Sequence, residues 1–329
     1  MLRRFFLSLK INLKIHSSRV KILCLDFFLQ KWYNQIKTLR RNILEDLSNA
    51  KVVKKIISEN DFKFSKSLGQ NFIVDPFVCP QMAESCGESD GIIEVGPGIG
   101  TLTAELAKRF KKVVSVELDK RLIPILKENL KDFPNSEIIY GDILKTDLSK
   151  IIKENLSGCE RVSVCANLPY YITSEVIMHI LESEFEINSI VVMVQKEAAE
   201  RICAEPGTRK SGAISLAVRY FGKPEILFDV NKTCFMPVPA VDSSVIRIKI
   251  CSENRKDIKN KNSFFKIVKA AFSQRRKNIL NSLSSGLKMP KNGIENLLAS
   301  AEIAQNLRAE NLKLDDFVKL SNELDLILK

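Results

Sequence analysis

Residues 91–110 read GIIEVGPGIGTLTAELAKRF. The first five residues are a short apolar run that predicts a buried strand, and Thr101 to Phe110 predicts a helix. Three glycines at alternate positions, 96, 98 and 100, form a tight turn between them. Glycines let the backbone approach a ligand, and the amino terminus of a helix offers free N–H groups. This order predicts one unit of an α/β sheet, with a ligand at the carboxyl end of its strand.

The spacing of the turn separates two kinds of ligand. It is GxGxG with an acid, Glu94, before it, whereas dinucleotide-binding enzymes carry GxGxxG. An acid at this place repels a pyrophosphate but can bind the ammonium group of an amino acid. S-adenosylmethionine carries such an ammonium and no phosphate, so the turn favours this methyl donor.

Two further predicted strands end in acids that suit the same ligand. Residues 112–117, KVVSVE, end in Glu117, about 20 residues after the turn, where a carboxylate can bind ribose hydroxyls. Residues 137–140 form a third apolar run, followed by Gly141 and Asp142. The Asp142 carboxylate can accept a hydrogen bond from the adenine amine of the donor. A glycine turn alone is weak evidence, but the turn and both acids in this order are specific.

The motif NLPY occupies residues 167–170. It follows an apolar, β-prone run at 161–166 and precedes a predicted helix that Thr173 or Ser174 can cap. The motif therefore falls at the carboxyl end of a strand, the edge at which open α/β sheets bind ligands. The alternative is an ordinary strand-to-helix turn, in which Asn and Pro are common.

The residues of this motif suit methylation of an exocyclic amine on a base. The side-chain oxygen of Asn167 and the backbone carbonyl of Leu168 can accept the hydrogens of an adenine amine. Pro169 fixes the local backbone, and Tyr170 can stack on the base. Acceptors placed in this way draw the nitrogen toward tetrahedral geometry and orient it, so no general base is required.

Composition limits the partners and the compartment. The chain has 329 residues, a formal net charge of +12 and a pI of about 9.2, which favours nucleic acid or an anionic membrane surface. A lysine-rich bias without a partner is the alternative. The eight cysteines include no CxxC pair, so we expect a reducing, cytoplasmic location without disulfides or a zinc site.

The chain divides into three parts. Residues 1–44 are basic and lack the long apolar run of a membrane span or signal peptide, so we expect an extension that methyl transfer does not need. Residues 45–251 are the predicted catalytic domain. A polar stretch, Ser252 to Asn262, marks the start of a helical domain at 252–329. Its predicted helices span residues 264–272, 277–283, 293–301 and 311–328.

Several segments outside the motifs suit a nucleic-acid partner, and each has a structural alternative. Residues 62–72 alternate lysines with aromatic side chains and can lie along phosphates and close over a ligand, or form a solvated linker. Other candidates are the loop 206–212, the group 274–277, and Lys196, Glu197, Glu200 and Arg201, which we expect beside the target cleft.

Taken together, the motifs resemble those of the ribosomal RNA adenine dimethyltransferase family, specifically its bacterial KsgA/RsmA branch. The matching stretches run from about residue 45 to the carboxyl terminus: SLGQNFIVD, IIEVGPGIGTLT, VVSVELD, GDILK, NLPYYIT, VQKEAAERI, FMPVPAVDSSVIRI and AFSQRRKNIL. The resemblance implies a class I, Rossmann-like methyltransferase domain that uses S-adenosyl-L-methionine, with a small all-helical, rRNA-binding domain after it. It also implies dimethylation of two adjacent adenosines in the 3′-terminal hairpin of 16S rRNA during small-subunit biogenesis.

The resemblance assigns site residues as well. It implies that Phe235, in a rigid proline-rich loop, sandwiches the flipped base against Tyr170, the alternative being a core residue. It places the donor contacts on Asn71, Ile73, Gly96, Glu117, Asp142 and Asn167, and the catalytic motif on Asn167, Leu168, Pro169 and Tyr170. It implies a cytoplasmic enzyme, expected to be a monomer, that acts on the small ribosomal subunit or its precursor without a metal or a membrane. The alternatives are a large-subunit rRNA adenine methyltransferase of the antibiotic-resistance type and a non-catalytic ribosome-assembly factor. A DNA adenine methylase fits less well, since those usually carry two prolines after the Asp or Asn.

Overall fold

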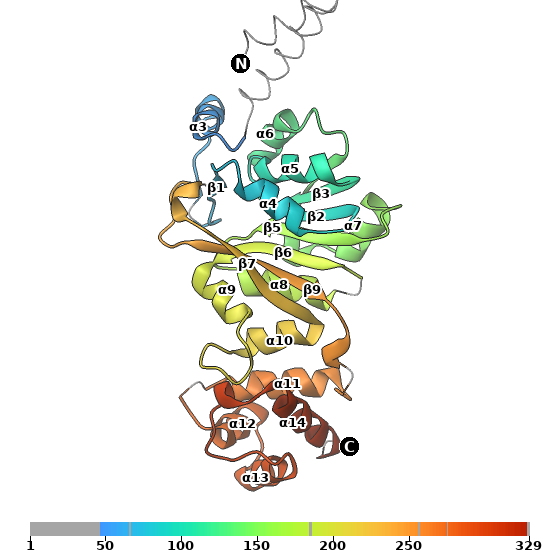
Figure 1. The fold of residues 1–329 in the computed structure, drawn as a ribbon, viewed down its shortest axis with the longest axis vertical. Helices are drawn as coiled ribbons and strands as arrows, with labels where there is room; N and C mark the ends of the chain where they lie inside the picture. The colour runs from blue at the N-terminus through green and yellow to red at the C-terminus, as the bar shows by residue number, and fades with distance from the viewer. Residues whose placement is uncertain (1–46, 66, 184–185, 256, 275, 328–329) are drawn as a thin grey trace, which may run out of the picture. The chain divides into compact units, whose positions relative to one another are not determined.

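The computed structural model describes residues 47–327 except 66, 184–185, 256 and 275 (Figure 1). Contacts along the chain separate residues 1–46 from Leu47–Lys329, and only the second unit is described below. The expectation that residues 1–44 are a dispensable extension therefore lies outside the described residues and stays a prediction.

A seven-stranded sheet forms the centre of this unit. Its strands are β2 (Gly91–Val95), β3 (Lys112–Glu117), β4 (Ser136–Tyr140), β5 (Val162–Asn167), β6 (Ser189–Gln195), β7 (Gly222–Val230) and β9 (Ser243–Ile250). They lie in the order β4-β3-β2-β5-β6-β9-β7. Strands β2 to β6 are parallel, and β9 runs antiparallel to β6 and β7. The α/β fold and the four strands predicted above, β2 to β5, are as predicted, within one residue at their ends.

The strands are apolar because helices cover both faces of the sheet. Side chains of Ile93, Val114 and Val164 point into one core with α7 (Leu148–Asn155), α8 (Thr173–Glu182) and α10 (Ala213–Phe221). The alternate side chains, Ile92, Val113 and Cys165, point into a second core. That core includes α4 (Val78–Ser85) and α5 (Thr101–Arg109), and α3 (Ala50–Glu59) and α6 (Leu122–Asn129) pack in a third cluster beside it. Successive side chains point to opposite faces and both faces are buried, which explains why the strands read as continuous apolar runs.

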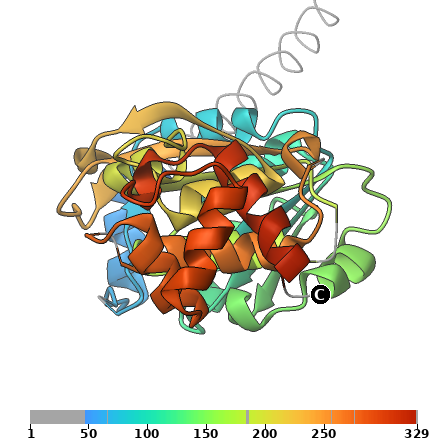
Figure 2. The same cartoon turned by 90° about the horizontal axis from the view of Figure 1, so that it is seen from below.

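Four helices follow the sheet: α11 (Lys261–Ala271), α12 (Ile279–Leu287), α13 (Lys291–Ser300) and α14 (Leu314–Ile327). They lie together, as the view from below shows (Figure 2). They are the four helices predicted after residue 252. Their core residues, among them Phe264, Leu297 and Phe317, belong to the same cluster as Ile93 and Val164 of the sheet. The sheet and the four helices share one hydrophobic core and belong to one compact unit. The division into two domains at residue 252 therefore stays a prediction.

Two strand pairings were missed by the sequence reasoning. Strand β7 carries Pro224 and the exposed residues Lys223, Glu225, Ile226 and Asp229, since it lies at the edge of the sheet, where a missing N–H is tolerated. The two-residue strands β1 (Phe72–Ile73) and β8 (Phe235–Met236) pair antiparallel with each other. Each is too short to carry a periodic signal, and both depend on a partner more than 160 residues away. Among the helices described, none is long and apolar enough to cross a membrane.

Candidate active site

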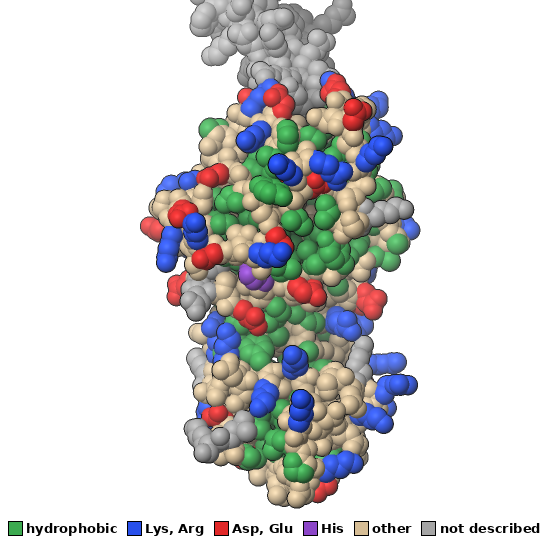
Figure 3. Space-filling model, turned by 180° about the vertical axis from the view of Figure 1, so that it is seen from behind, with side chains coloured by type: hydrophobic (Ala, Val, Ile, Leu, Met, Phe, Trp, Pro, Cys, Tyr) green, Lys and Arg blue, Asp and Glu red, His purple; other side chains and the backbone are tan. Residues whose placement is uncertain are grey.

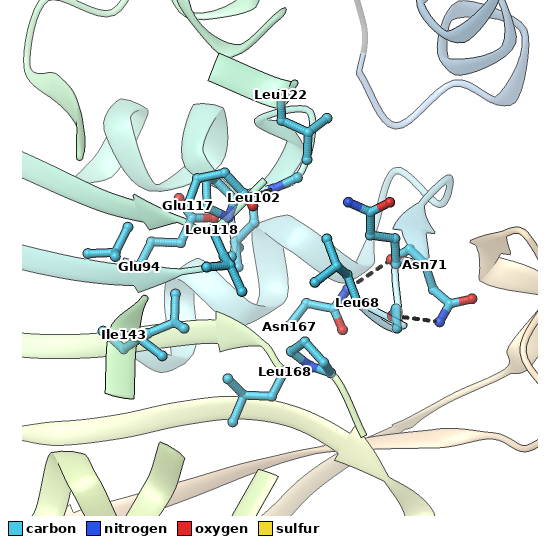
Figure 4. A pocket seen from close by; sticks show the side chains of 18 of the residues that line it. Leu68, Asn71, Glu94, Leu102, Glu117, Leu118, Leu122, Ile143, Asn167 and Leu168 are labelled. Atoms are coloured by element: carbon cyan, nitrogen blue, oxygen red, sulfur yellow. Dashed lines mark hydrogen bonds between the residues drawn. The ribbon is translucent and has the colours of Figure 1, made fainter. Parts of the chain in front are cut away.

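A cavity lies at the carboxyl ends of β2, β3 and β5, where the strand order reverses between β2 and β5 (Figure 4). This reversal point is where open α/β sheets bind ligands, because the loops from neighbouring strands leave in opposite directions. The structure brings most of the predicted site residues to this cavity. Those that line it are Asn71, Ile73, Gly96, Glu117, Asp142, Asn167, Leu168, Pro169 and Tyr170.

The glycine turn adopts the conformation for which glycine is needed. Gly96, Gly98 and Gly100 have φ angles of +67°, +62° and +94°, and Gly100 is the N-cap of α5. A Cβ on Gly96 would meet no atom within 4 Å, since this residue faces the open cavity. The turn therefore exposes bare backbone to whatever occupies the cavity, as predicted for a donor site.

Gly96→Ala is expected to weaken donor binding by about tenfold or more, because a methyl group would enter the donor space. The left-handed φ adds a cost of about 1–2 kcal/mol to folding. Gly87 is the matched control, since it has the same φ of +67°, no atom within 4 Å of a Cβ, and no place in the cavity lining. Calorimetric titration of the donor should separate the two variants, because Gly87→Ala should lose stability but keep its donor affinity. Equal donor affinities of the two variants would exclude Gly96 from the donor site.

Glu94, the acid before the turn, is 1% exposed and lines the cavity. Its Oε2 accepts hydrogen bonds from Thr103 Oγ1 and Ser115 Oγ, both at 2.6 Å. Its Oε1 has no hydrogen-bond partner within the described part of the chain. A buried acceptor without a partner is costly, and a bound ammonium group would supply one. This oxygen therefore fits the amino-acid end of S-adenosylmethionine.

Burial raises the pKa of the Glu94 carboxyl to about 7, and it raises the pKa of Glu117 to about 7 as well. Each pKa in the folded protein lies above the ordinary value of 4.5, so the contribution of each carboxyl to the free energy of unfolding is fully present below pH 4.5. This contribution is lost as the pH rises through 7, because the buried carboxyls must then ionise. We expect the ligand-free protein to lose stability between pH 5 and 8, by roughly 3 kcal/mol for each carboxyl at most.

Glu94→Gln should flatten this pH dependence, because the amide does not ionise, and should also weaken donor binding. Urea unfolding at pH 5 and pH 8 would measure the change. Glu88→Gln is the control, since Glu88 is exposed and paired with Arg161 away from the cavity. A variant with the full wild-type pH slope would contradict the assignment of the slope to Glu94.

Glu117 ends β3 and both of its oxygens are occupied by backbone donors. Oε2 accepts from Gly98 N at 3.3 Å, and Oε1 accepts from Asp119 N at 2.7 Å. The carboxylate thus fixes the glycine turn as well as facing the cavity. Asp142, after β4, accepts from Leu144 N with Oδ1 at 3.1 Å, and its Oδ2 lies 3.7 Å from Lys145 Nζ. Both acids lie where their strands end, as predicted.

The side chain of Asn167 is held in one orientation. Its Nδ2 donates to the backbone carbonyl of Asn71 at 3.1 Å, shown as a dashed line in Figure 4. Because a carbonyl can only accept, this bond identifies the nitrogen and leaves Oδ1 as the outward-facing acceptor. Ala166 pairs with Val95, so Asn167 and Gly96 leave neighbouring strands side by side. Asn167 and the glycine turn therefore line the same cavity, and Oδ1 is the side-chain atom of Asn167 left to accept a hydrogen bond there.

Tyr170 is half-buried, and its hydroxyl shares a 2.9 Å hydrogen bond with the buried Ser243 Oγ. The residue lines the cavity. The predicted cap of the next helix is wrong in detail. Helix α8 begins at Thr173 with Ile172 as N-cap and no side-chain cap, and Thr173 Oγ1 instead donates back to Pro169 O at 3.2 Å.

The structure corrects the expected role of Phe235. Its side chain is 2% exposed, packs in the core with Val78 and Met193, and does not line the cavity. The pairing of β8 with β1 draws it inward, opposite Ile73. Stacking on a base opposite Tyr170 is not available in this conformation, and the alternative, a core residue, is what the structure contains.

Two of the basic residues expected near the target, Lys196 and Lys210, form ion pairs on the surface. Lys196 Nζ lies 2.6 Å from Asp229 Oδ2, and Lys210 Nζ lies 2.7 Å from Glu200 Oε2. None of the residues expected beside the cleft lines the cavity. In the group 274–277, Arg275 lies outside the described residues. Contact of any of these residues with RNA stays a prediction.

Two residues that line the cavity, Tyr171 and Gln70, were missed, and so was Asp119, which binds Gln70. Tyr171 is 54% exposed at the cavity and directly follows the motif. Gln70 and Asp119 meet each other across 49 positions of sequence, and no local pattern predicts such a contact. Within the described ranges, no three His, Cys, Asp or Glu side chains gather to hold a metal ion. The cysteines described are free.

The chain is similar to known proteins over most of its length. A family model described as "Ribosomal RNA adenine dimethylase" matches residues 61–326. "Ribosomal RNA small subunit methyltransferase A" of Alkaliphilus oremlandii is 45% identical over 284 residues, which are 85% of this chain and 99% of that protein. The protein of the same description in Clostridioides difficile is 44% identical over 281 residues, 85% of this chain and 97% of that one.

Two solved structures share the fold. A dimethyladenosine transferase from Plasmodium falciparum gives a TM-score of 0.63 at 25% identity, covering 77% of this chain and 97% of that chain. The 23S rRNA methyltransferase ErmE gives a TM-score of 0.59 at 26% identity, covering 77% of this chain and 99% of that chain. The fold is therefore that of the Rossmann-like methyltransferases.

Proposed function

This chain belongs to the ribosomal RNA adenine dimethylase family, and from that premise we propose that it dimethylates two adjacent adenosines in the 3′-terminal hairpin of 16S rRNA, with S-adenosyl-L-methionine as methyl donor. The observation that carries the proposal is the amide of Asn167 in the lining of the cavity, where its Nδ2 is bound to the Asn71 carbonyl and its Oδ1 is left as an acceptor, with the glycine turn in the same lining.

The donor fits the residues of the cavity. Glu94 Oε1 would accept from the ammonium group, Glu117 would face the ribose hydroxyls, and Asp142 would accept from the adenine amine. Gly96 leaves room for the methionine part of the donor close to the backbone. When bound, the sulfonium supplies an electrophilic methyl group. By family resemblance, Asn71 and Ile73 complete this set, and both line the cavity.

The motif supplies the groups that would act on the target amine. Asn167 Oδ1 and the carbonyl of Leu168 accept its two hydrogens and orient its lone pair toward the methyl group. Pro169 fixes the backbone that carries this carbonyl. The ring of Tyr170, anchored by Ser243, offers a face for the base. No residue is needed as a general base, because the proton leaves after the nitrogen has become positively charged.

The choice of ribosomal subunit rests on the relatives. The small-subunit relatives reach 40–45% identity, compared with 26% for the large-subunit enzyme of known structure. This difference favours the small subunit over the resistance-type alternative. The net charge of +12 suits a polyanionic substrate, and Lys and Arg side chains spread over both the sheet and the helical part of one face (Figure 3).

Transfer of tritium from labelled donor into immature ribosomal subunits tests the proposal. We expect label in small-subunit RNA only, and dimethyladenosine in its nucleosides by mass spectrometry. Label in large-subunit RNA would favour the resistance-type alternative. Binding of small subunits without any transfer would favour the non-catalytic assembly factor.

A further inference from the structure

Residues 65–71, here called the strap, cross the cavity between the donor side and the motif NLPY. Leu68, Gly69, Gln70 and Asn71 line the cavity from this segment. The described residues of the strap, 65 and 67–71, belong to no helix or strand, so side chains must fix its path. Gln70 does so with both ends of its amide: Oε1 accepts from Ser65 N at 2.8 Å, and Nε2 donates to Asp119 Oδ2 at 2.8 Å.

The partner of Gln70 is itself rigidly held. Asp119 is 6% exposed, and Arg121 donates to its two oxygens from Nε at 2.9 Å and from Nη2 at 2.6 Å. These hydrogen bonds keep the pKa of Asp119 below its ordinary value. Arg121 also donates to Lys63 O at 3.1 Å, just before the strap. The backbone N–H of Asp119 donates to the Glu117 carboxylate. Asp119, which holds the strap, is therefore joined to the carboxylate that would face the methyl donor.

The other side of the strap meets the catalytic motif at two points. The carbonyl of Asn71, next in sequence to Gln70, accepts from Asn167 Nδ2 at 3.1 Å. Gly69 has a φ of +60°, and a Cβ there would lie 3.3 Å from Pro169 Cβ. The side chain of Asn71 closes the turn by donating to Gly69 O at 3.1 Å. A shift of the strap would therefore move the group that orients Asn167.

We propose that Gln70, held by Asp119, is a positioning residue that fixes the strap and thereby the orientation of the Asn167 amide. The chain of contacts runs from Glu117 through Asp119, Gln70 and the Asn71 carbonyl to Asn167. It joins the donor side of the cavity to the group that would accept the target amine. This inference rests on the proposed function.

The test compares Gln70→Met in two backgrounds, wild type and Asn167→Ala, by single-turnover tritium transfer at saturating donor and RNA. Met has the length of Gln but forms neither hydrogen bond. We expect Gln70→Met to lower the rate about tenfold in the wild-type background, because small misplacements of reacting groups have effects of this size or larger. In the Asn167→Ala background it should change the rate less than about twofold, since the group it positions is gone.

Controls separate this inference from a general loss of stability and from the proposed function. Asn135→Ala removes hydrogen bonds to Ala107 O and Phe110 O at the opposite edge of the sheet, and should lower the melting temperature but not the rate. Gln70→Glu, which would place a carboxylate against Asp119, should repeat the effect of Gln70→Met. Equal rate losses in both backgrounds, or no loss in either, would overturn the inference. A wild-type protein that transfers no methyl group would instead refute the proposed function.

Discussion

Replacing Asn167 by Ala is expected to lower the rate of methyl transfer by about 10²–10³-fold at saturating donor and RNA. The substitution removes the side-chain acceptor that faces the cavity and leaves only the carbonyl of Leu168 for the target amine. The donor site keeps Glu94, Glu117 and Asp142, so donor affinity should fall much less than the rate. Single-turnover transfer together with calorimetric titration of S-adenosylhomocysteine measures both quantities.

Asn167→Asp refines this test. Aspartate keeps an acceptor in place but cannot donate to the Asn71 carbonyl, which the wild-type amide does at 3.1 Å. The rate should lie between those of the wild type and Asn167→Ala, because the acceptor remains while its orientation is lost. A near-normal rate for Asn167→Ala would mean that another group accepts the hydrogens of the amine, and the mechanism proposed for the motif would have to be abandoned.

The second large effect is expected at Glu117, where Gln should weaken donor binding by about 10–100-fold. Both carboxylate oxygens accept from backbone N–H groups, of Gly98 and Asp119. A Gln side chain must turn its own NH₂ toward one of them, so two donors would face each other. The glycine turn would lose a support, and the ribose hydroxyls would lose a charged acceptor. The affinity for S-adenosylhomocysteine, measured by calorimetry, reports this loss.

Glu137 provides the matched control for Glu117. It lies on the adjacent strand β4, is exposed, and accepts from Asn155 Nδ2 at 2.7 Å outside the cavity. Glu137→Gln should leave the affinity for S-adenosylhomocysteine unchanged. If the two variants lost affinity equally, the effect would reflect the sheet as a whole, and Glu117 would lose its place as a donor-binding residue.

Residues that follow directly from a strand could be predicted from the sequence. A buried parallel strand is a continuous apolar run, and the polar residue after it must appear at the carboxyl edge of the sheet. Glu117, Asp142 and Asn167 were found in this way, and the structure brings all three to one cavity. The ammonium-binding role that we propose for Glu94 was inferred from the charge before the turn, and its unpartnered oxygen fits that proposal.

Features that depend on distant pairings could not be predicted. Phe235 was expected to face the base. The sequence around it gives no sign that β8 pairs with β1, and this pairing places its side chain in the core. The contacts of Gln70 with Asp119 and of Tyr170 with Ser243 join residues 49 and 73 positions apart. Short-range patterns carry no information on such contacts, so the parts of the site that orient the reactive groups appeared only in the structure.

The apolar cluster that joins the sheet to α11–α14 limits how this protein can be truncated or recombined with its relatives. Ile248 of β9 and Tyr220 of α10 belong to the same cluster as Phe264 of α11, and the Tyr220 and Phe264 rings stack with centroids 5.5 Å apart. A fragment ending at residue 251 would bare this aromatic surface to water and should aggregate rather than fold alone. Exchange of the helical segment between relatives would therefore succeed only if the incoming segment packs against the aromatic surface of the sheet that receives it.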